Sequence, residues 1–169
     1  QPESSAASDV YKRQIICWSV RSYFESFYQG EIIKKMKRYK NILVTGASGF
    51  IGSNFIKVVF DNNEFSKSVE NIINLDKLTY AGNIKNNKEY SANPKYNFIK
   101  GDIASEEIVY KILMQYQIDL VVNFAAESHV DNSINDPSEF IKTNIFGVYN
   151  LLSCSKKYED LGNQITLLH

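Results

Sequence analysis

The chain has 169 residues, of which 44% are hydrophobic, so it is long enough to bury the core of one domain. Basic and acidic residues number 19 each, and this balance leaves no basic surplus to attract nucleic acid or an anionic membrane. No apolar run approaches the roughly 20 residues that span a bilayer. The two cysteines, Cys17 and Cys154, show no metal-ligand spacing. We therefore expect a cytoplasmic protein that binds no metal, nucleic acid or membrane.

The first 35 residues differ from the rest of the chain. Gln1–Ser8 is small and polar, and Ile15–Val20 is apolar but too short for a membrane anchor. Asp9–Gln14 resembles the translation of an adapter used in sequencing libraries. We therefore interpret residues 1–35 as a non-native or disordered leader, and we place the folded domain at residues 36–169.

A strand, a glycine turn and a helix open this domain. Ile42–Val44 is wholly apolar, as is typical of a parallel strand that is buried on both faces. Three glycines then follow at spacings of three, namely Gly46, Gly49 and Gly52. A helix with apolar residues at helical spacing runs from about Gly49 to Asp61. This order is typical of a dinucleotide pyrophosphate site, although an ordinary glycine-rich turn is the alternative.

Polar residues also follow the next three predicted strands. Strand 70–75 is followed by Asp76, strand 96–100 by Asp102, and strand 119–123 by the loop 124–131. Ligands of open α/β sheets bind at the carboxyl ends of the strands, which lie together at one edge. The position of all these groups at that edge predicts a ligand site there.

Two acids have specific expected roles. Asp76 could accept hydrogen bonds from both ribose hydroxyls of an adenosine, and it would repel a 2′-phosphate, which favours NAD over NADP. The alternative for Asp76 is a solvated loop acid. Asp102 could accept from the adenine amino group, or it could simply be a turn residue.

The fourth strand and the helix beyond it offer further candidates, each with an alternative. Ala125 and Ala126 are small enough to let a cofactor lie close, or they relieve helix packing. His129 invites a catalytic or metal role, but with no second ligand nearby we favour a loop histidine that is satisfied by hydrogen bonds. Thr143 and Asn144 could reach the cofactor or bond the helix backbone.

The last helix and strand complete the predicted fold. Residues 136–139 begin a helix with an Asp N-cap, Pro and Glu, and one face of it carries Ile141, Ile145, Val148 and Leu152. Gly147 in mid-helix suggests close packing on a neighbour. Residues 164–169 open a fifth strand, where the sequence stops. We predict a Rossmann-type doubly wound parallel α/β sheet in the order 3-2-1-4-5, truncated after the start of the fifth strand.

Several of these stretches resemble a known family. Thr45–Phe55 resembles the opening of the extended short-chain dehydrogenase/reductase family. The more specific stretches are similar to the dTDP-glucose 4,6-dehydratases within it: Asp76–Asn83, Gly101–Ile103, Ala125–Asp131 and Lys142–Asn144. The chain departs mildly from the family pattern at two places. Ala47–Ser48 replaces the commoner Gly-Ala of the glycine turn, and Asn132 stands where a basic residue often follows the His-Val-Asp sequence.

The resemblance implies an NAD-binding Rossmann domain with a defined set of contacts. The pyrophosphate, ribose and adenine contacts would be Gly46, Gly49, Phe50, Ile51, Gly52, Asp76, Lys77, Leu78, Thr79, Asp102 and Ile103. The contacts along the rest of the cofactor would be Phe124, Ala125, Ala126, Glu127 and Thr143. Ser128 would face the sugar of a nucleotide-sugar substrate.

The resemblance also implies the chemistry of a lyase. Hydride leaves C4 of the glucose ring, water is lost across C5–C6, and hydride returns to C6, so dTDP-glucose becomes dTDP-4-keto-6-deoxyglucose. The Tyr-x-x-x-Lys pair and the dehydration acids of this family lie beyond the position that matches His169, as does the substrate domain. We therefore expect the cofactor half of a homodimeric enzyme, inactive alone. The alternatives are another nucleotide-sugar epimerase or decarboxylase of the extended family, and a non-catalytic NAD-binding regulator.

Overall fold

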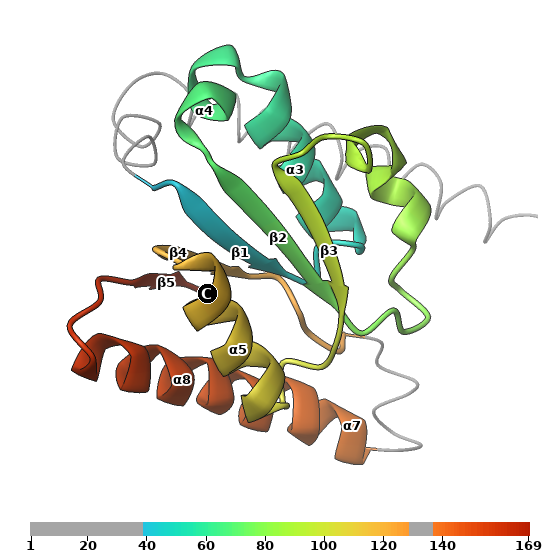
Figure 1. The fold of residues 1–169 in the computed structure, drawn as a ribbon. Helices are drawn as coiled ribbons and strands as arrows, with labels where there is room; N and C mark the ends of the chain where they lie inside the picture. Colours follow the sequence, from blue (N-terminus) through green and yellow to red (C-terminus); the bar gives the residue numbers. More distant parts are fainter. Residues whose placement is uncertain (1–38, 129–136) are drawn as a thin grey trace, which may run out of the picture. The chain divides into compact units, whose positions relative to one another are not determined.

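The computed structural model describes residues 39–128 and 137–169, which form a parallel sheet with helices on both faces (Figure 1). The strand order is β3-β2-β1-β4-β5, as predicted. The strands are β1 (Asn41–Thr45), β2 (Asn71–Asp76), β3 (Tyr96–Lys100), β4 (Leu120–Asn123) and β5 (Thr166–Leu168). The predictions for the leader 1–35, His129, Asn132 and Asp136 lie outside the described residues.

The helical elements connect these strands. They are α3 (Phe50–Asp61), α4 (Asn63–Ser68), the 3₁₀ helix η1 (Ile84–Tyr90), α5 (Glu106–Tyr116), α7 (Pro137–Ile141), the π-helical stretch η2 (Lys142–Gly147) and α8 (Val148–Asp160). Figure 1 shows α5 and α8 on one face of the sheet and α3 on the other. Among the described residues, no helix is long and apolar enough to cross a membrane.

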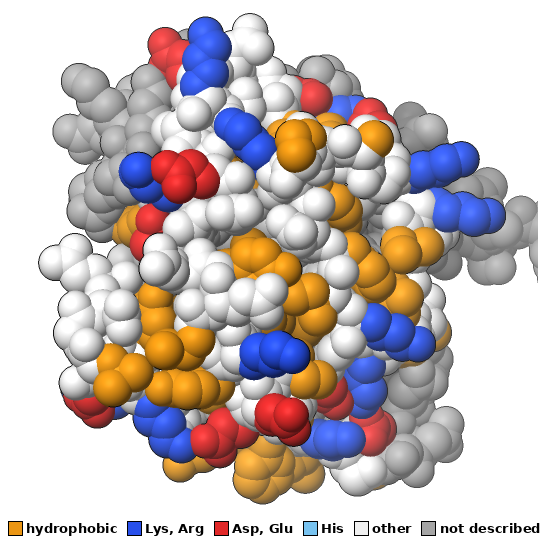
Figure 2. Space-filling view, in the orientation of Figure 1, with side chains coloured by type: hydrophobic (Ala, Val, Ile, Leu, Met, Phe, Trp, Pro, Cys, Tyr) orange, Lys and Arg blue, Asp and Glu red, His pale blue; other side chains and the backbone are white. Residues whose placement is uncertain are grey.

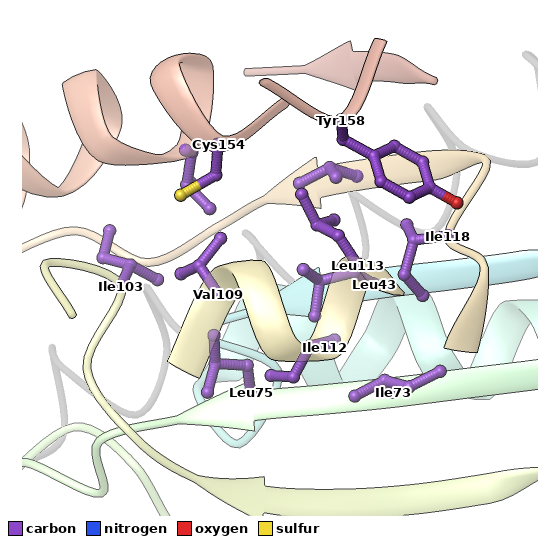
Figure 3. Packing of buried hydrophobic residues seen from close by; sticks show 12 residues of the cluster. Leu43, Ile73, Leu75, Ile103, Val109, Ile112, Leu113, Ile118, Cys154 and Tyr158 are labelled. Carbon is purple, nitrogen blue, oxygen red and sulfur yellow. The ribbon is translucent and has the colours of Figure 1, made fainter. Parts of the chain in front are cut away.

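A hydrophobic core lies between the sheet and the pair α5 and α8 (Figure 3). Leu43 on the central strand lies opposite Ile73 on one side and Val121 on the other, and all three side chains are completely buried. Burying one such side chain stabilises the fold by roughly 1.5–3 kcal/mol. The helices contribute Val109, Ile112, Leu113, Leu151, Cys154 and Tyr158. This core fixes the orientation of the strands and therefore the position of their carboxyl ends.

The short helix α4 follows α3 after a single residue, Asn62. The side-chain oxygen of Asn62 accepts hydrogen bonds from the backbone N–H groups of Glu64 and Phe65, at 3.1 and 2.9 Å. Asn62 is thus an N-cap for α4, and Phe65 is buried beneath that helix. The break is a single residue long because the same asparagine that ends α3 begins α4.

The helix formed by α7, η2 and α8 buries a different face from the one that its apolar spacing suggests. Ile141, Ile145 and Leu152 share a face as predicted, but their side chains are 46%, 60% and 52% exposed. The buried face instead carries Thr143, Gly147, Asn150, Leu151, Cys154, Ser155 and Tyr158. The outer face is thus apolar without being part of this domain's core.

Candidate functional site

The glycine turn after β1 has a geometry that only glycine fits at two of its positions. Gly46 has a φ of +65°, and a Cβ built there would lie 2.6 Å from the backbone nitrogen of Ala125. A Cβ on Gly52 would lie 2.6 Å from the Cα of Ala47. The turn therefore packs backbone against backbone, both on the loop after β4 and on the start of α3.

Helix α3 begins directly after Gly49, so its first amides lie beside this turn. Gly49 is the N-cap residue, no side chain caps the helix, and its first turn holds no acidic residue. The first N–H groups of a helix have no partner within that helix, and its dipole places a partial positive charge there. Phe50 and Ile51 at this end are 43% and 48% exposed. These features suit an anion such as a pyrophosphate.

Asp76 ends β2 directly beside the glycine turn. Its side chain is buried, and its two oxygens accept hydrogen bonds from the backbone N–H groups of Ser48 and Leu78, at 2.8 and 2.7 Å. Leu78 adopts a left-handed backbone, with a φ of 57°, at the residue that donates this second hydrogen bond. Asp76 therefore lies at the carboxyl edge of the sheet as predicted, and it is held by the backbone rather than solvated as a loop acid.

Asp102 follows β3 and belongs to a group of four charged side chains. Its Oδ1 accepts the Ala104 N–H at 2.9 Å, which makes it the turn residue that the sequence allowed. Its Oδ2 lies 3.1 Å from Lys77 Nζ. Burial raises the pKa of Asp102, but the Ala104 N–H and the Lys77 ammonium outweigh it, so this pKa lies below its ordinary value. The adenine contact of Asp102 stays a prediction.

The same lysine connects this turn to the last helix. Lys77 Nζ lies 2.9 Å from Glu139 Oε2, and this hydrogen bond is the main reason why the pKa of Lys77 is raised and that of Glu139 lowered. Lys142 Nζ lies 3.8 Å from both Asp102 and Glu139. We call these four residues the charged cluster. The part played by Glu139 and Lys142 was not predicted, because their distance in sequence from Lys77 hides the contact.

The loop after β4 runs over the glycine turn. The Phe124 N–H donates to the carbonyl of Thr45 at 3.1 Å, and the Phe124 ring packs on Phe55 of α3 with 5.5 Å between ring centroids. Thr45 and Asn123 share a short, buried hydrogen bond between their side chains. The backbone of Ala125 comes so close to Gly46 that residue 46 must be glycine, whereas the roles predicted for the small side chains of Ala125 and Ala126 stay predictions.

Asn144 fixes the far end of this loop. Its side-chain oxygen accepts the Glu127 N–H at 2.9 Å, and its side-chain nitrogen donates to the Glu127 carbonyl at 2.8 Å. Its amide group therefore bonds the loop backbone, an arrangement that neither of the two sequence-based alternatives described. Thr143 beside it is buried, and Ser128 is exposed at the end of the described part of the loop.

The helix and the loop after β3 also meet closely. A Cβ on Gly147 would lie 2.5 Å from Ile103 Cδ1, which confirms the close packing predicted for this glycine. Asn150 donates to the backbone carbonyl of Ile103 at 2.7 Å. Ile103, an expected adenine contact, therefore has its backbone and side chain held by this one helix.

The fold and the site together define a dinucleotide-binding domain of the Rossmann class, with a glycine turn and an acid one strand away. The family described as GDP-mannose 4,6 dehydratase matches residues 43–169. The chain belongs to this family.

Individual relatives agree with this assignment. A dTDP-glucose 4,6-dehydratase of Salmonella typhimurium is 42% identical over 133 residues, which cover 76% of this chain and 36% of the relative. The crystal structure of a Bacillus anthracis dTDP-glucose 4,6-dehydratase in complex with NAD superposes with a TM-score of 0.63 at 39% identity, covering 76% of this chain and 36% of that one. The crystal structure of a Streptomyces venezuelae dTDP-glucose 4,6-dehydratase with NAD and TYD bound superposes with a TM-score of 0.65 at 39% identity. The match covers 70% of this chain and 36% of that one. The chain thus spans about a third of the length of these proteins.

Proposed function

We propose that this chain is the cofactor-binding part of an NAD-dependent dTDP-glucose 4,6-dehydratase, a lyase that forms dTDP-4-keto-6-deoxyglucose and water. The similarity to dTDP-glucose 4,6-dehydratases favours this activity over that of the epimerases, decarboxylases and regulators that would share the same cofactor site. The single observation that carries the proposal is the Asp76 carboxylate held 2.8 Å from the backbone nitrogen of Ser48 in the glycine turn.

The described residues fit NAD. The amides at the start of α3 suit the pyrophosphate, and no acid in that first turn opposes it. Asp76 is a ribose acceptor that disfavours a 2′-phosphate, which supports NAD over NADP. The residues that we propose to hold the cofactor are Gly46, Gly49, Phe50, Ile51, Gly52, Asp76, Lys77, Leu78, Thr79, Asp102, Ile103, Phe124, Ala125, Ala126, Glu127 and Thr143. When bound, NAD supplies a hydride acceptor and donor next to the sugar.

The substrate in this proposal is a nucleotide sugar, with Ser128 facing its sugar ring. The groups expected to activate the C4 hydroxyl and to drive the loss of water are not among the residues that we propose to bind cofactor or substrate. The chain on its own is therefore proposed to bind cofactor without catalysing dehydration, and its proposed location is the cytoplasm. Dehydration of dTDP-glucose by the purified chain would contradict the proposal that this chain alone is inactive.

The outer face of the helix formed by α7, η2 and α8 supports a homodimer. Its exposed apolar side chains are Ile141, Ile145, Phe146, Tyr149 and Leu152, each between 46% and 68% exposed. Figure 2 shows hydrophobic atoms at the surface along its lower edge, where Figure 1 places α8. A contiguous apolar patch on a helix is typical of a protein interface. Ile145→Asp should shift the chain from dimer to monomer in analytical ultracentrifugation, whereas Lys156→Asp on the charged part of α8 should not.

The test of the proposed function is isothermal titration of the chain with NAD⁺ and with NADP⁺. We expect tighter binding of NAD⁺. Asp76→Asn should weaken NAD⁺ binding by about 10- to 150-fold, since a hydrogen bond to a charged group is worth roughly 1.5–3 kcal/mol. The matched control is Asp160→Asn, because Asp160 is an exposed acid of α8 that pairs only with Lys156 among the contacts described. A preference for NADP⁺, or equal effects of the two substitutions, would contradict the proposal.

A further inference from the structure

Two asparagines contact the carbonyl groups of the glycine turn. Asn86 and Asn87 belong to η1, the short helix that follows the loop after Asp76. Asn87 is 1% exposed, although its neighbours in this polar segment are mostly at the surface. The segment is anchored on α3, because the rings of Tyr90 and Phe60 stack with centroids 4.7 Å apart. A buried amide side chain in an otherwise solvated stretch calls for a partner.

That partner is the backbone of the glycine turn. The side-chain nitrogen of Asn87 donates to the Ala47 carbonyl at 2.7 Å, and Ala47 is completely buried. Asn87 also departs from helical backbone geometry, with φ −113° and ψ 18°, so η1 kinks at the residue that makes this bond. The backbone of η1 is therefore irregular at the same residue whose side chain binds the turn.

The next carbonyl of the turn is held from the same side. The Ser48 carbonyl accepts from the Asn86 side chain at 2.8 Å and from the Asn83 backbone N–H at 2.9 Å. Two successive carbonyls of the turn are therefore fixed by one short segment. Because each peptide unit is planar and trans, fixing its carbonyl also fixes the direction of its N–H.

The same two peptide units carry the N–H groups of Ser48 and Gly49, which make hydrogen bonds within the proposed site. The Ala47 carbonyl and the Ser48 N–H belong to one peptide unit, and this N–H donates to Asp76 Oδ2 at 2.8 Å. The Ser48 carbonyl shares its peptide unit with the Gly49 N–H, which donates to the Gly46 carbonyl at 3.1 Å. A chain of hydrogen bonds thus runs from Asn87 through the turn to the proposed ribose acceptor.

We propose that Asn87, assisted by Asn86, is a positioning residue that orients the glycine turn and Asp76 for cofactor binding. This inference rests on the proposed NAD site. It assigns to the polar segment 84–90 a function that its composition alone does not show. Neither asparagine would touch the cofactor, because each acts through the backbone of residues 47 and 48.

The main test replaces Asn87 with leucine, which has a similar volume but no amide. Asn87→Leu should weaken NAD⁺ binding about tenfold, because a turn that is no longer held by Asn87 must be ordered when the cofactor binds. Asn86→Ala should weaken it less, by about threefold, because the Ser48 carbonyl keeps the Asn83 N–H. The matched control is Asn62→Ala, which removes the cap of α4 and lowers stability without touching the turn.

A second measurement separates positioning from general stability. In the full chain without cofactor, hydrogen exchange at the Ser48 amide should accelerate in Asn87→Leu relative to the rest of β1 and α3, and it should not do so in Asn62→Ala. NAD⁺ affinity within twofold of the unsubstituted chain, or unchanged Ser48 exchange, would overturn the proposal. If Asn87→Leu does not fold, Asn86→Ala decides by the same criteria. If the unsubstituted chain binds no NAD⁺, the proposed function fails, and the Ser48 exchange rate still decides on the positioning role.

Discussion

Asp76 ends β2 and Asp102 follows the end of the neighbouring β3, and the two acids are held in different ways. Asp76 is 7% exposed and accepts two backbone N–H groups, whereas Asp102 accepts one backbone N–H and otherwise pairs with the flexible Lys77. Backbone donors allow little movement, while ion pairs near the surface tolerate it and are weakened by salt. The comparison indicates that the proposed ribose end of the site, at Asp76, is rigid and that the proposed adenine end, at Asp102, is adjustable.

The largest effect should come from the turn that supports the rigid end. Gly46→Ala introduces a left-handed alanine and a Cβ 2.6 Å from the Ala125 nitrogen, so we expect a loss of about 3 kcal/mol or more in the free energy of unfolding. Gly162→Ala is the matched control, because Gly162 has a φ of +90° but no atom lies within 4 Å of a Cβ built there. That control should lose only about 1 kcal/mol in urea unfolding. Equal losses would show that the close approach to the loop after β4 is unimportant.

Neutralising the two acids tests the comparison directly. Asp76→Asn leaves one acceptor oxygen for two amides, so the free energy of unfolding should fall by about 1–3 kcal/mol. Asp102→Asn should lower it by less than about 1 kcal/mol, since Asp102 is partly solvated. Urea unfolding at pH 7 measures both. A larger loss at Asp102 would reverse the assignment of rigid and adjustable ends.

The pH dependence should come in part from the adjustable end. The pKa of Asp102 is lower in the folded chain than its ordinary value of 3.8, so the unfolded chain binds this proton more tightly. The stabilisation by Asp102 is therefore complete above this ordinary value and is lost as the pH falls through the lower, folded pKa. Unfolding free energies measured from about pH 5 down to pH 3 should fall less steeply in Asp102→Asn. An unchanged slope would contradict the ion pair.

The smallest effect should come from salt. Lys77→Gln removes the link between Asp102 and Glu139, and we expect the melting temperature to fall by about 2 °C at low ionic strength. In 1 M NaCl the unsubstituted chain and the variant should differ less, because salt screens exposed pairs. Lys85→Gln is a control on an exposed lysine of η1. A difference that persists in high salt would show that the cluster is as rigid as the Asp76 site.

Much of the fold could be predicted because its signals are local. A buried apolar strand, a glycine turn and an amphipathic helix occupy consecutive residues from Asn41 to Asp61, and the right-handed crossover rule then orders the strands. Asp76 could be placed because it ends a strand. These features depend on short stretches of sequence, and the structure confirms their positions.

Other features depend on contacts across the chain or on a distinction that periodicity does not make. The spacing of Ile141, Ile145 and Leu152 indicates an apolar face, but it does not say whether that face meets the core or another molecule. Asn144 and Lys142 reach partners distant in sequence, at Glu127 and Asp102. The N-cap role of Asn62 was missed because residues 61–64 are all polar, and such a run also suits a loop.

The contact of Gly147 and Asn150 with Ile103 connects the proposed dimer interface to the proposed cofactor site. One helix carries the outer apolar patch on one side and holds an expected adenine contact on the other. If NAD binding shifts Ile103 and this helix with it, association of two copies and occupancy by NAD are thermodynamically linked, and each changes the other by the same factor. Diluting the protein should therefore change its apparent affinity for the nucleotide.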